Sequence, residues 1–166
     1  MTTTDEPVLM EVKGLMMDPK SNVPIVILRS EEQSKMLPIW IGIFEANAIA
    51  VNLEGIQPPR PMTHDLFLNL IEAVKYEVNQ ILIHDLVDNT FFAQIFLKAD
   101  GEDLVVDSRP SDAIALALRA KAPILVSQAV LQKAKIDEIT ERSLDKDKLK
   151  KWLEEIDPED LGKYTM

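Results

Sequence analysis

A short combination of polar residues occurs twice in the chain, each time before an apolar stretch with helical spacing. Residues 59–66 read Pro-Arg-Pro-Met-Thr-His-Asp-Leu, and residues 107–113 read Asp-Ser-Arg-Pro-Ser-Asp-Ala. Each copy supplies a guanidinium, a hydroxyl and a carboxylate at the expected start of a helix. A helix start presents unpaired backbone N–H groups and the positive end of the helix dipole. Two such starts that faced one cavity would bind anions or metal-bound phosphate groups.

The first copy contains His64, one of only two histidines in the chain. Together with Arg60 and Asp65 it forms a candidate acid–base or metal-ligand cluster. The alternative is a capping motif, in which Thr63 caps the helix, Asp65 meets the dipole and His64 is solvated. Spacing alone favours the capping motif, so this copy does not define a site by itself.

The second copy contains two carboxylates that flank a turn. Asp107 ends an expected strand and Asp112 opens the following helix, a position where sheet proteins often place functional groups. Two carboxylates five residues apart across such a turn can hold a divalent cation through oxygen ligands. The alternative is again local, because Ser108 or Ser111 can cap the helix while Asp112 complements its dipole. The spacing leaves these two interpretations open.

Arg109 and Glu45 favour a site at the second copy. An arginine at a helix start opposes the dipole, so Arg109 needs an anion or a carboxylate such as Glu45 as its partner. Glu45 begins an otherwise apolar helix, directly after residues 40–44 (Trp-Ile-Gly-Ile-Phe). A buried carboxylate in these surroundings must be paired or have a raised pKa. If Glu45 is buried, we expect it to be a metal ligand or the partner of Arg60 or Arg109; otherwise it is a first-turn acid near the surface.

The elements around these residues predict an α+β fold, with a mixed or antiparallel sheet, helices packed against it and a weak internal repeat. The expected strands cover residues 8–17, 23–28, 36–41, 80–87, 91–98, 104–107 and 124–126. A hairpin turn is expected at residues 88–90. The expected helices cover residues 44–53, 64–77, 108–119 and 127–134. The core stripe predicted for the second of these helices comprises Leu66, Phe67, Leu70, Ile71 and Val74.

Composition limits the classes of protein and partner. Residues 1–136 are predicted to form the α+β domain, and residues 137–166 a charged helical appendage. The net charge is −10; residues 137–166 carry ten acids and six bases, and the rest of the chain carries 18 acids and 12 bases. The lack of a basic face argues against strong, non-specific nucleic-acid binding.

Cysteine is absent, which excludes disulfides and thiolate sites and fits a reducing compartment. With no signal peptide and no apolar run of about 20 residues, we expect a cytoplasmic protein without a membrane span.

Several segments together resemble the bifunctional nuclease family of bacteria and plants. They are residues 37–42, 45–50, 59–66 and 106–117, in the order found in that family. The resemblance extends over roughly residues 8–135. It implies a compact α+β domain that acts as a nuclease on both DNA and RNA and self-associates as a homodimer. An exposed edge of the first three-stranded meander is a candidate surface for that association.

The polar signature implied by the resemblance is Glu45, Arg60, His64, Asp65, Asp107, Ser108, Arg109 and Asp112. Our leading hypothesis is a phosphodiesterase assisted by Mg²⁺ or Mn²⁺. In this hypothesis His64 activates water or protonates the leaving group, Asp65 orients His64, and Glu45 completes the catalytic group. The metal ligands are Glu45, Asp107 and Asp112, and the phosphate-binding residues are Arg60, Ser108 and Arg109.

A second hypothesis assigns no catalysis to these residues. In it the arginines and carboxylates form buried ion pairs that fix the helix starts, and the protein is a binding or regulatory module. The acidic composition and the lack of a basic groove favour this hypothesis. In a third hypothesis, the same arginines bind a small anionic ligand such as a nucleotide.

Overall fold

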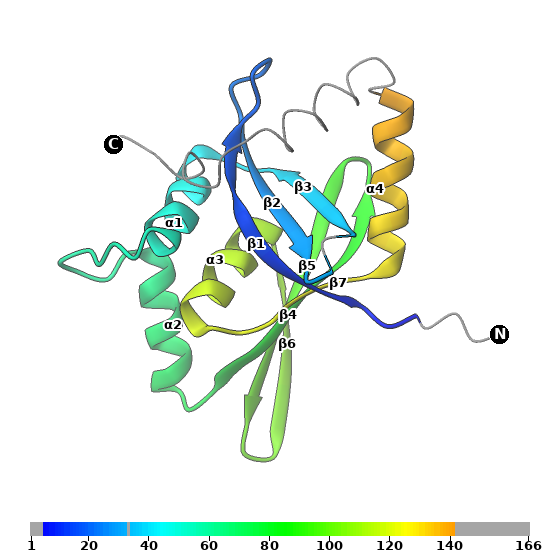
Figure 1. Ribbon diagram of the computed structural model, residues 1–166. Helices are drawn as coiled ribbons and strands as arrows, with labels where there is room; N and C mark the ends of the chain where they lie inside the picture. The colour runs from blue at the N-terminus through cyan, green and yellow to red at the C-terminus, as the bar shows by residue number, and fades with distance from the viewer. Residues whose placement is uncertain (1–4, 33, 142–166) are drawn as a thin grey trace.

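Seven strands form one twisted sheet in the order β3-β2-β1-β7-β4-β5-β6. The structure is a computed structural model that describes residues 5–32 and 34–141, with side chains up to residue 134. The strands are β1 (Val8–Met17), β2 (Pro24–Ser30), β3 (Met36–Trp40), β4 (Glu77–Val87), β5 (Thr90–Ala99), β6 (Glu102–Ser108) and β7 (Ile124–Val126). The short strand β7 joins the two halves, because it pairs antiparallel with β1 and parallel with β4. The predicted α+β class with a mixed sheet is confirmed (Figure 1).

Each half of the sheet is a three-stranded antiparallel meander. The hairpin between β4 and β5 has the expected short turn, in which Asp88 and Asn89 adopt positive φ angles of 49° and 60°. Asn and Asp tolerate this conformation, and its twist suits a two-residue hairpin. A helix follows the third strand of each meander, α1 (Ile43–Leu53) after β3 and α3 (Pro110–Ala120) after β6. The internal repeat is therefore visible in the architecture.

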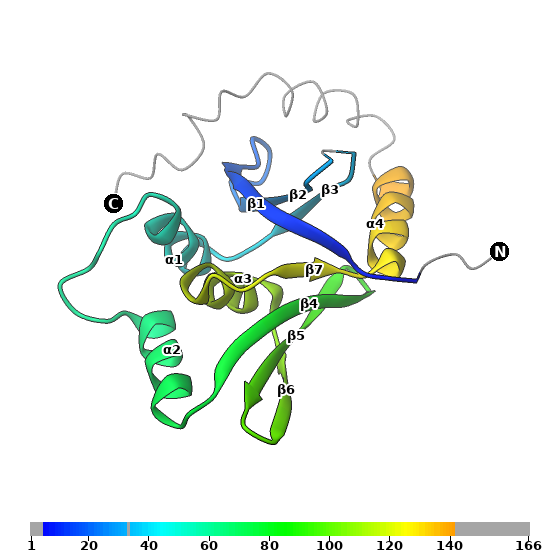
Figure 2. The same ribbon diagram turned by 60° about the horizontal axis from the view of Figure 1, so that its bottom comes forward.

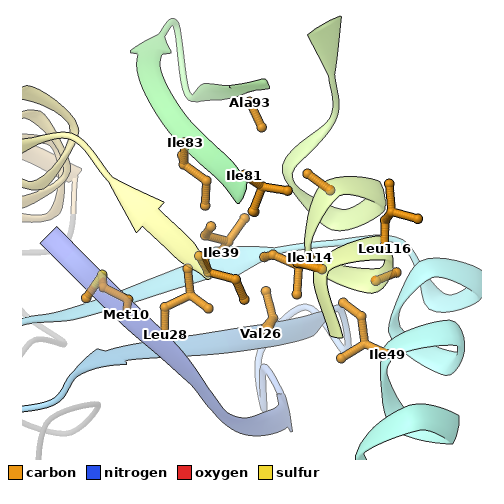
Figure 3. Packing of buried hydrophobic residues seen from close by; sticks show 14 of the residues in the cluster. Met10, Val26, Leu28, Ile39, Ile49, Ile81, Ile83, Ala93, Ile114 and Leu116 are labelled. Atoms are coloured by element: carbon orange, nitrogen blue, oxygen red, sulfur yellow. The ribbon is translucent and has the colours of Figure 1, made fainter. Parts of the chain in front are cut away.

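Helix α3 lies against the sheet and forms the centre of the hydrophobic core (Figure 2). Its residues from Ala113 to Ala117 are almost fully buried. Ile114 and Leu116 pack with side chains of β2, β4 and α1 (Figure 3). Both α1 and α2 (Thr63–Ala73) contact α3. The core therefore determines where the first turns of these three helices lie.

Helix α2 differs from its prediction in length and in the face that it buries. It ends at Ala73 instead of residue 77, because Lys75 takes a left-handed conformation (φ 68°) and β4 begins at Glu77. Of the predicted core stripe only Ile71 is buried, whereas Leu66, Leu70 and Val74 are 61%, 56% and 58% exposed. The more buried face instead carries His64, Leu68 and Ile71, at helical spacing. The predicted stripe is therefore wrong for this helix, and its polar first turn lies on the packed side.

Helix α4 (Gln128–Glu141) contacts β4 and is longer than the predicted 127–134. It crosses the expected boundary between residues 136 and 137, and the rest of the predicted appendage, 142–166, lies outside the described residues. None of the described helices is long and apolar enough to cross a membrane.

The two edges of the sheet are β3 and β6. Strand β3 contains Pro38, which has no N–H to donate to a further strand.

Candidate functional site

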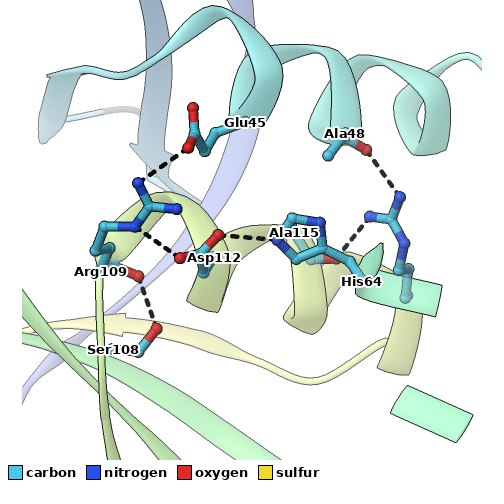
Figure 4. A network of polar contacts seen from close by, with 8 residues as sticks. Glu45, Ala48, His64, Ser108, Arg109, Asp112 and Ala115 are labelled. Carbon is cyan, nitrogen blue, oxygen red and sulfur yellow. Dashed lines mark hydrogen bonds and ion pairs between the residues drawn. The ribbon is translucent and has the colours of Figure 1, made fainter. Parts of the chain in front are cut away.

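Four ionisable side chains form a continuous chain of contacts across the first turns of α1, α2 and α3 (Figure 4). Arg109 Nη1 lies 2.9 Å from Glu45 Oε1, and Arg109 Nε donates to Asp112 Oδ2 at 2.8 Å. The other oxygen of Asp112, Oδ1, lies 2.9 Å from His64 Nε2. Of the alternatives that the sequence left open for Glu45, the structure shows the contact with Arg109. The structure brings Glu45, His64, Arg109 and Asp112 together.

The position of Glu45 depends on the glycine at the start of its helix. Gly42 is the N-cap of α1, and Glu45 lies in its first turn. The Glu45 carboxylate folds back so closely that a Cβ on residue 42 would overlap Oε2. A glutamate at this position of a helix commonly turns toward the N-cap backbone. Gly42 thus leaves the space from which Glu45 reaches Arg109.

The contacts of Asp112 with Arg109 and His64 keep Asp112 ionised. Partial burial of Asp112 acts to raise its pKa, but hydrogen bonds from Arg109 and His64 outweigh burial and lower the pKa below its usual value. The hydrogen bond to Asp112 also raises the pKa of Arg109, with a further contribution from Glu45. The side chains differ in access to solvent, because that of Arg109 is 64% exposed and that of His64 only 16%. Of the four contacting side chains, Arg109 is therefore the one that a ligand meets first.

A second network fixes the start of α2. Arg119, with a side chain only 6% exposed, donates from Nε to Asp65 Oδ1 at 2.7 Å. Its Nη1 donates to the carbonyl of Ala115 at 2.9 Å, and its Nη2 to the carbonyl of Ala48 at 3.0 Å. The second oxygen of Asp65 accepts the backbone N–H of Met62 at 2.9 Å. This arrangement joins α1, α2 and α3 through one guanidinium.

Two expectations about the first copy of the motif need correction. Thr63 is the first residue of α2 and not its cap; Asp65 supplies the capping interaction by accepting from Met62. His64 forms its hydrogen bond with Asp112, whose carboxylate accepts, whereas Asp65 accepts from Arg119. The partner of His64 is therefore a residue of the second copy. Local spacing could not reveal it, because 48 residues separate His64 and Asp112.

The other predicted residues lie outside the central chain of contacts. Asp107 is exposed near the end of β6, opposite Gln94 of β5. Ser108 donates its hydroxyl to the carbonyl of Arg109 at 2.8 Å. Arg60 is exposed in the connection before α2, and no ion pair joins it to another described residue.

The expected metal-ligand set is not assembled in this arrangement. Among the described residues, no group of three or more His, Cys, Asp or Glu side chains is placed to hold a metal ion. Two of the three predicted ligands, Glu45 and Asp112, both bind Arg109. A cation that used these two carboxylates would have to take the place of the guanidinium.

Comparison with known proteins identifies the family. The family model described as the bifunctional nuclease domain matches residues 26–139, which include all of the side chains described above. The chain belongs to the bifunctional nuclease domain family. The resemblance noted in the sequence is thereby confirmed.

Relatives of this bifunctional nuclease domain occur in bacteria and plants. An uncharacterized protein of Mycobacterium tuberculosis is 38% identical over 159 residues, which are 90% of this chain and 95% of that protein. Bifunctional nuclease 2 of Oryza sativa subsp. japonica is 30% identical over 111 residues, which are 64% of this chain and 34% of the rice protein. Bifunctional nuclease 1 of Arabidopsis thaliana is 30% identical over 109 residues, with coverages of 63% and 34%. The match thus spans about a third of each of these plant proteins.

Arg119 is the residue of this bifunctional nuclease domain that sequence reasoning missed. A cation in the last turn of a helix ordinarily complements the helix dipole, so its position in α3 suggested no further role. The one signal was an arginine in an otherwise alanine- and leucine-rich helix, where a buried charge needs a partner. Its partner Asp65 lies 54 residues away in the sequence.

Proposed function

We propose that this member of the bifunctional nuclease family hydrolyses phosphodiester bonds of DNA and RNA at the Glu45–Arg109–Asp112–His64 chain of contacts. The observation that carries the proposal is the hydrogen bond between His64 and Asp112 beside an exposed arginine. A histidine held by a carboxylate is suited to general acid–base catalysis. An exposed guanidinium is suited to a phosphate group. Family membership supports the same reaction.

In this proposal each side chain has a distinct role. Arg109 binds the phosphate oxygens through charge-assisted hydrogen bonds, and the start of α3 adds to the attraction. His64 activates water or protonates the leaving oxygen, while Asp112 orients its ring through Nε2. Glu45 holds Nη1 of Arg109, while Asp112 holds its Nε. Arg60 and Ser108 are candidates for additional phosphate contacts, and Asp65 acts on the site through α2.

A requirement for Mg²⁺ or Mn²⁺ is a separate proposal. The donor set described above does not fit a three-ligand metal site, because Asp107 stands apart and Arg109 binds both Glu45 and Asp112. None of the roles given to the side chains depends on a cation. Cleavage assays in EDTA and in added Mg²⁺ or Mn²⁺ test the requirement directly.

Cleavage of labelled single-stranded DNA and RNA by matched preparations of the parent protein and His64→Ala tests the catalytic proposal. General acid–base catalysis contributes about 10²- to 10⁴-fold, so we expect a loss in that range. His84→Ala is the matched control, because the second histidine lies on β4 and accepts the Ser127 hydroxyl through its backbone carbonyl, which alanine retains. Equal cleavage by the parent and His64→Ala contradicts the proposal.

A binding module remains the second candidate function. The favouring observation is that Arg109 already joins two carboxylates from two helices, as a structural ion pair would. A small anionic ligand at Arg109 belongs to this candidate. Titration with nucleotides tests it, because a ligand that binds the folded state raises the melting temperature with concentration.

Two further expectations from the sequence, a homodimer and a cytoplasmic location, also remain proposals. The exposed apolar residues of α2 give the dimer a second candidate surface besides the sheet edge. Sedimentation equilibrium over a range of protein concentrations measures the association. Cell fractionation measures the location.

A further inference from the structure

We propose that Arg119 is a positioning residue for His64. It fixes the first turn of α2 against α1 and α3 and thereby sets the hydrogen bond between His64 and Asp112. The inference rests on the proposed function only where it gives His64 a catalytic role. The positional relationship itself can be measured without any activity.

The first step is the geometry of the guanidinium. Nε, Nη1 and Nη2 of Arg119 point to acceptors on three different segments: the Asp65 carboxylate of α2, the Ala115 carbonyl of α3 and the Ala48 carbonyl of α1. All three distances are between 2.7 and 3.0 Å. Only a planar fork can satisfy three acceptors in these directions, and a lysine ammonium cannot reproduce it. Arg119 therefore fixes α2 relative to both neighbouring helices.

The second step is that α2 has little else to hold its first turn. Ile71 is the only buried residue among its 11 residues, and it lies in the C-terminal half of the helix. The connection before the helix, residues 54–62, is almost entirely exposed. A helix of this length is only marginally stable by itself in water. Apart from the bond of His64 itself to Asp112, the polar contacts of Asp65 are therefore the attachment of the first turn of α2 to its neighbouring helices.

The third step is the adjacency of Asp65 and His64. Asp65 is held at both oxygens, by Arg119 at Oδ1 and by the Met62 N–H at Oδ2. This double contact fixes the backbone of the first turn and so the direction in which the side chain of the preceding residue, His64, leaves it. A shift of about 1 Å in such a position can reduce a rate by about 10²-fold. Loss of the Arg119 fork should therefore move the His64 ring away from Asp112.

The test is an NMR measurement on the two imidazole rings. The chain has only two histidines, so a His84→Gln variant assigns both sets of ring resonances. The Asp112→Asn variant then gives the reference positions of the His64 resonances when its bond to Asp112 is altered. In Arg119→Lys, which keeps the charge but loses the fork, we expect the His64 resonances to move toward those of Asp112→Asn. The His84 resonances should stay in place and report an intact sheet. Unchanged His64 resonances in a folded Arg119→Lys protein overturn the proposal.

Lys133→Met is the matched control. Lys133 Nζ lies 2.7 Å from Asp85 Oδ1, so this ion pair is as short as the one between Arg119 and Asp65, but it is on the surface beside His84. Its removal should affect His84 and leave His64 unchanged. Should Arg119→Lys fail to fold, Asp65→Asn removes the charge of the partner with Arg119 intact and must shift His64 in the same direction. Unchanged His64 resonances in folded Asp65→Asn overturn the proposal as well.

Activity adds a separate readout. Where the parent cleaves nucleic acid, Arg119→Lys should reduce kcat by about 10- to 100-fold. KM should change little, because Arg109 still binds phosphate. If the parent does not cleave, the nuclease proposal fails while the NMR result still decides the role of Arg119. A fall in kcat of this size in Arg119→Lys without any change in the His64 resonances contradicts the positioning role of Arg119.

Discussion

Arg109 Nη1 lies 2.9 Å from Glu45 Oε1, and this contact joins the two helices that follow the two three-stranded meanders. Glu45 is in the first turn of α1, after β3, and Arg109 is the N-cap of α3, after β6. The structural repeat therefore pairs α1 with α3. The Arg-Pro motif in the sequence instead pairs α2 with α3, and α2 lies between the two halves in chain order. The candidate site combines the equivalent helices with this additional one, which supplies His64.

Replacement of Arg109 by Met should separate a catalytic site from a structural ion pair. Because the Arg109 side chain is 64% exposed, loss of its ion pairs should cost only about 1 kcal/mol of unfolding free energy. Loss of a phosphate-binding donor should reduce cleavage by about 10²- to 10³-fold. Urea unfolding and cleavage assays on the same preparations measure both. A large loss of stability with unchanged activity would show that Arg109 forms a structural ion pair and that cleavage does not depend on it.

Gly42→Ala should displace Glu45 without unfolding the domain. The new Cβ would overlap the far end of the Glu45 side chain, which can rotate away, so we expect a stability loss of less than about 1 kcal/mol. The pair with Arg109 should be lost, so Arg109→Met should then change the melting temperature less than it does in the parent. Thermal unfolding of the two single variants and the double variant measures this coupling.

Gly55→Ala is the control for the glycine substitution. Gly55 has a φ of 67°, and a Cβ at this position would meet no atom within 4 Å, so alanine there brings backbone strain without affecting Glu45. The effect of Arg109→Met should be the same with and without this change. Full coupling of Arg109 to Glu45 in Gly42→Ala would show that Glu45 has another route to the guanidinium.

Neighbouring residues of α2 should respond very differently to truncation. Ile71 is 5% exposed, so Ile71→Ala should cost about 2–4 kcal/mol. Leu70 is 56% exposed, so Leu70→Ala should cost less than about 1 kcal/mol in a monomer. Urea unfolding at low protein concentration measures both values. A large loss in Leu70→Ala that grows with protein concentration would indicate that this face is buried in a dimer.

Acid should weaken the fold partly through Asp18. Trp40 Nε1 donates to Asp18 Oδ2 at 3.0 Å, and this bond, with those from Lys20 N–H and Ser21, lowers the pKa of Asp18 from 3.8 to about 2. Since the folded-state pKa is depressed, the stabilisation is fully present above about pH 4 and is lost as the pH falls through about 2. Urea unfolding between pH 4 and pH 2 should show a fall of at most about 2 kcal/mol that Asp18→Asn lacks. The same pH dependence in both proteins contradicts this assignment.

Local patterns were enough to predict most of the elements. Apolar-rich runs between turn residues indicated the strands of both halves, and residues 88–90 indicated the hairpin turn, because these features depend on neighbours within a few positions. The face of α2 could not be predicted in this way. Leu66, Leu70 and Val74 have helical spacing, yet the helix packs through the face that carries His64. Periodicity identifies an apolar stripe but not which neighbouring element it meets.

The family, the α+β class and most of the polar residues of the candidate site follow from the amino-acid sequence alone. The sequence also indicated that Arg109 needed an anion or a carboxylate such as Glu45 as its partner, because an arginine at a helix start opposes the dipole. The pairing of His64 with Asp112 and of Asp65 with Arg119 emerges only when the chain is folded. These pairs are separated by 48 and 54 residues. Their contacts depend on how α1 and α2 pack against α3, and that packing follows from the burial of the whole core.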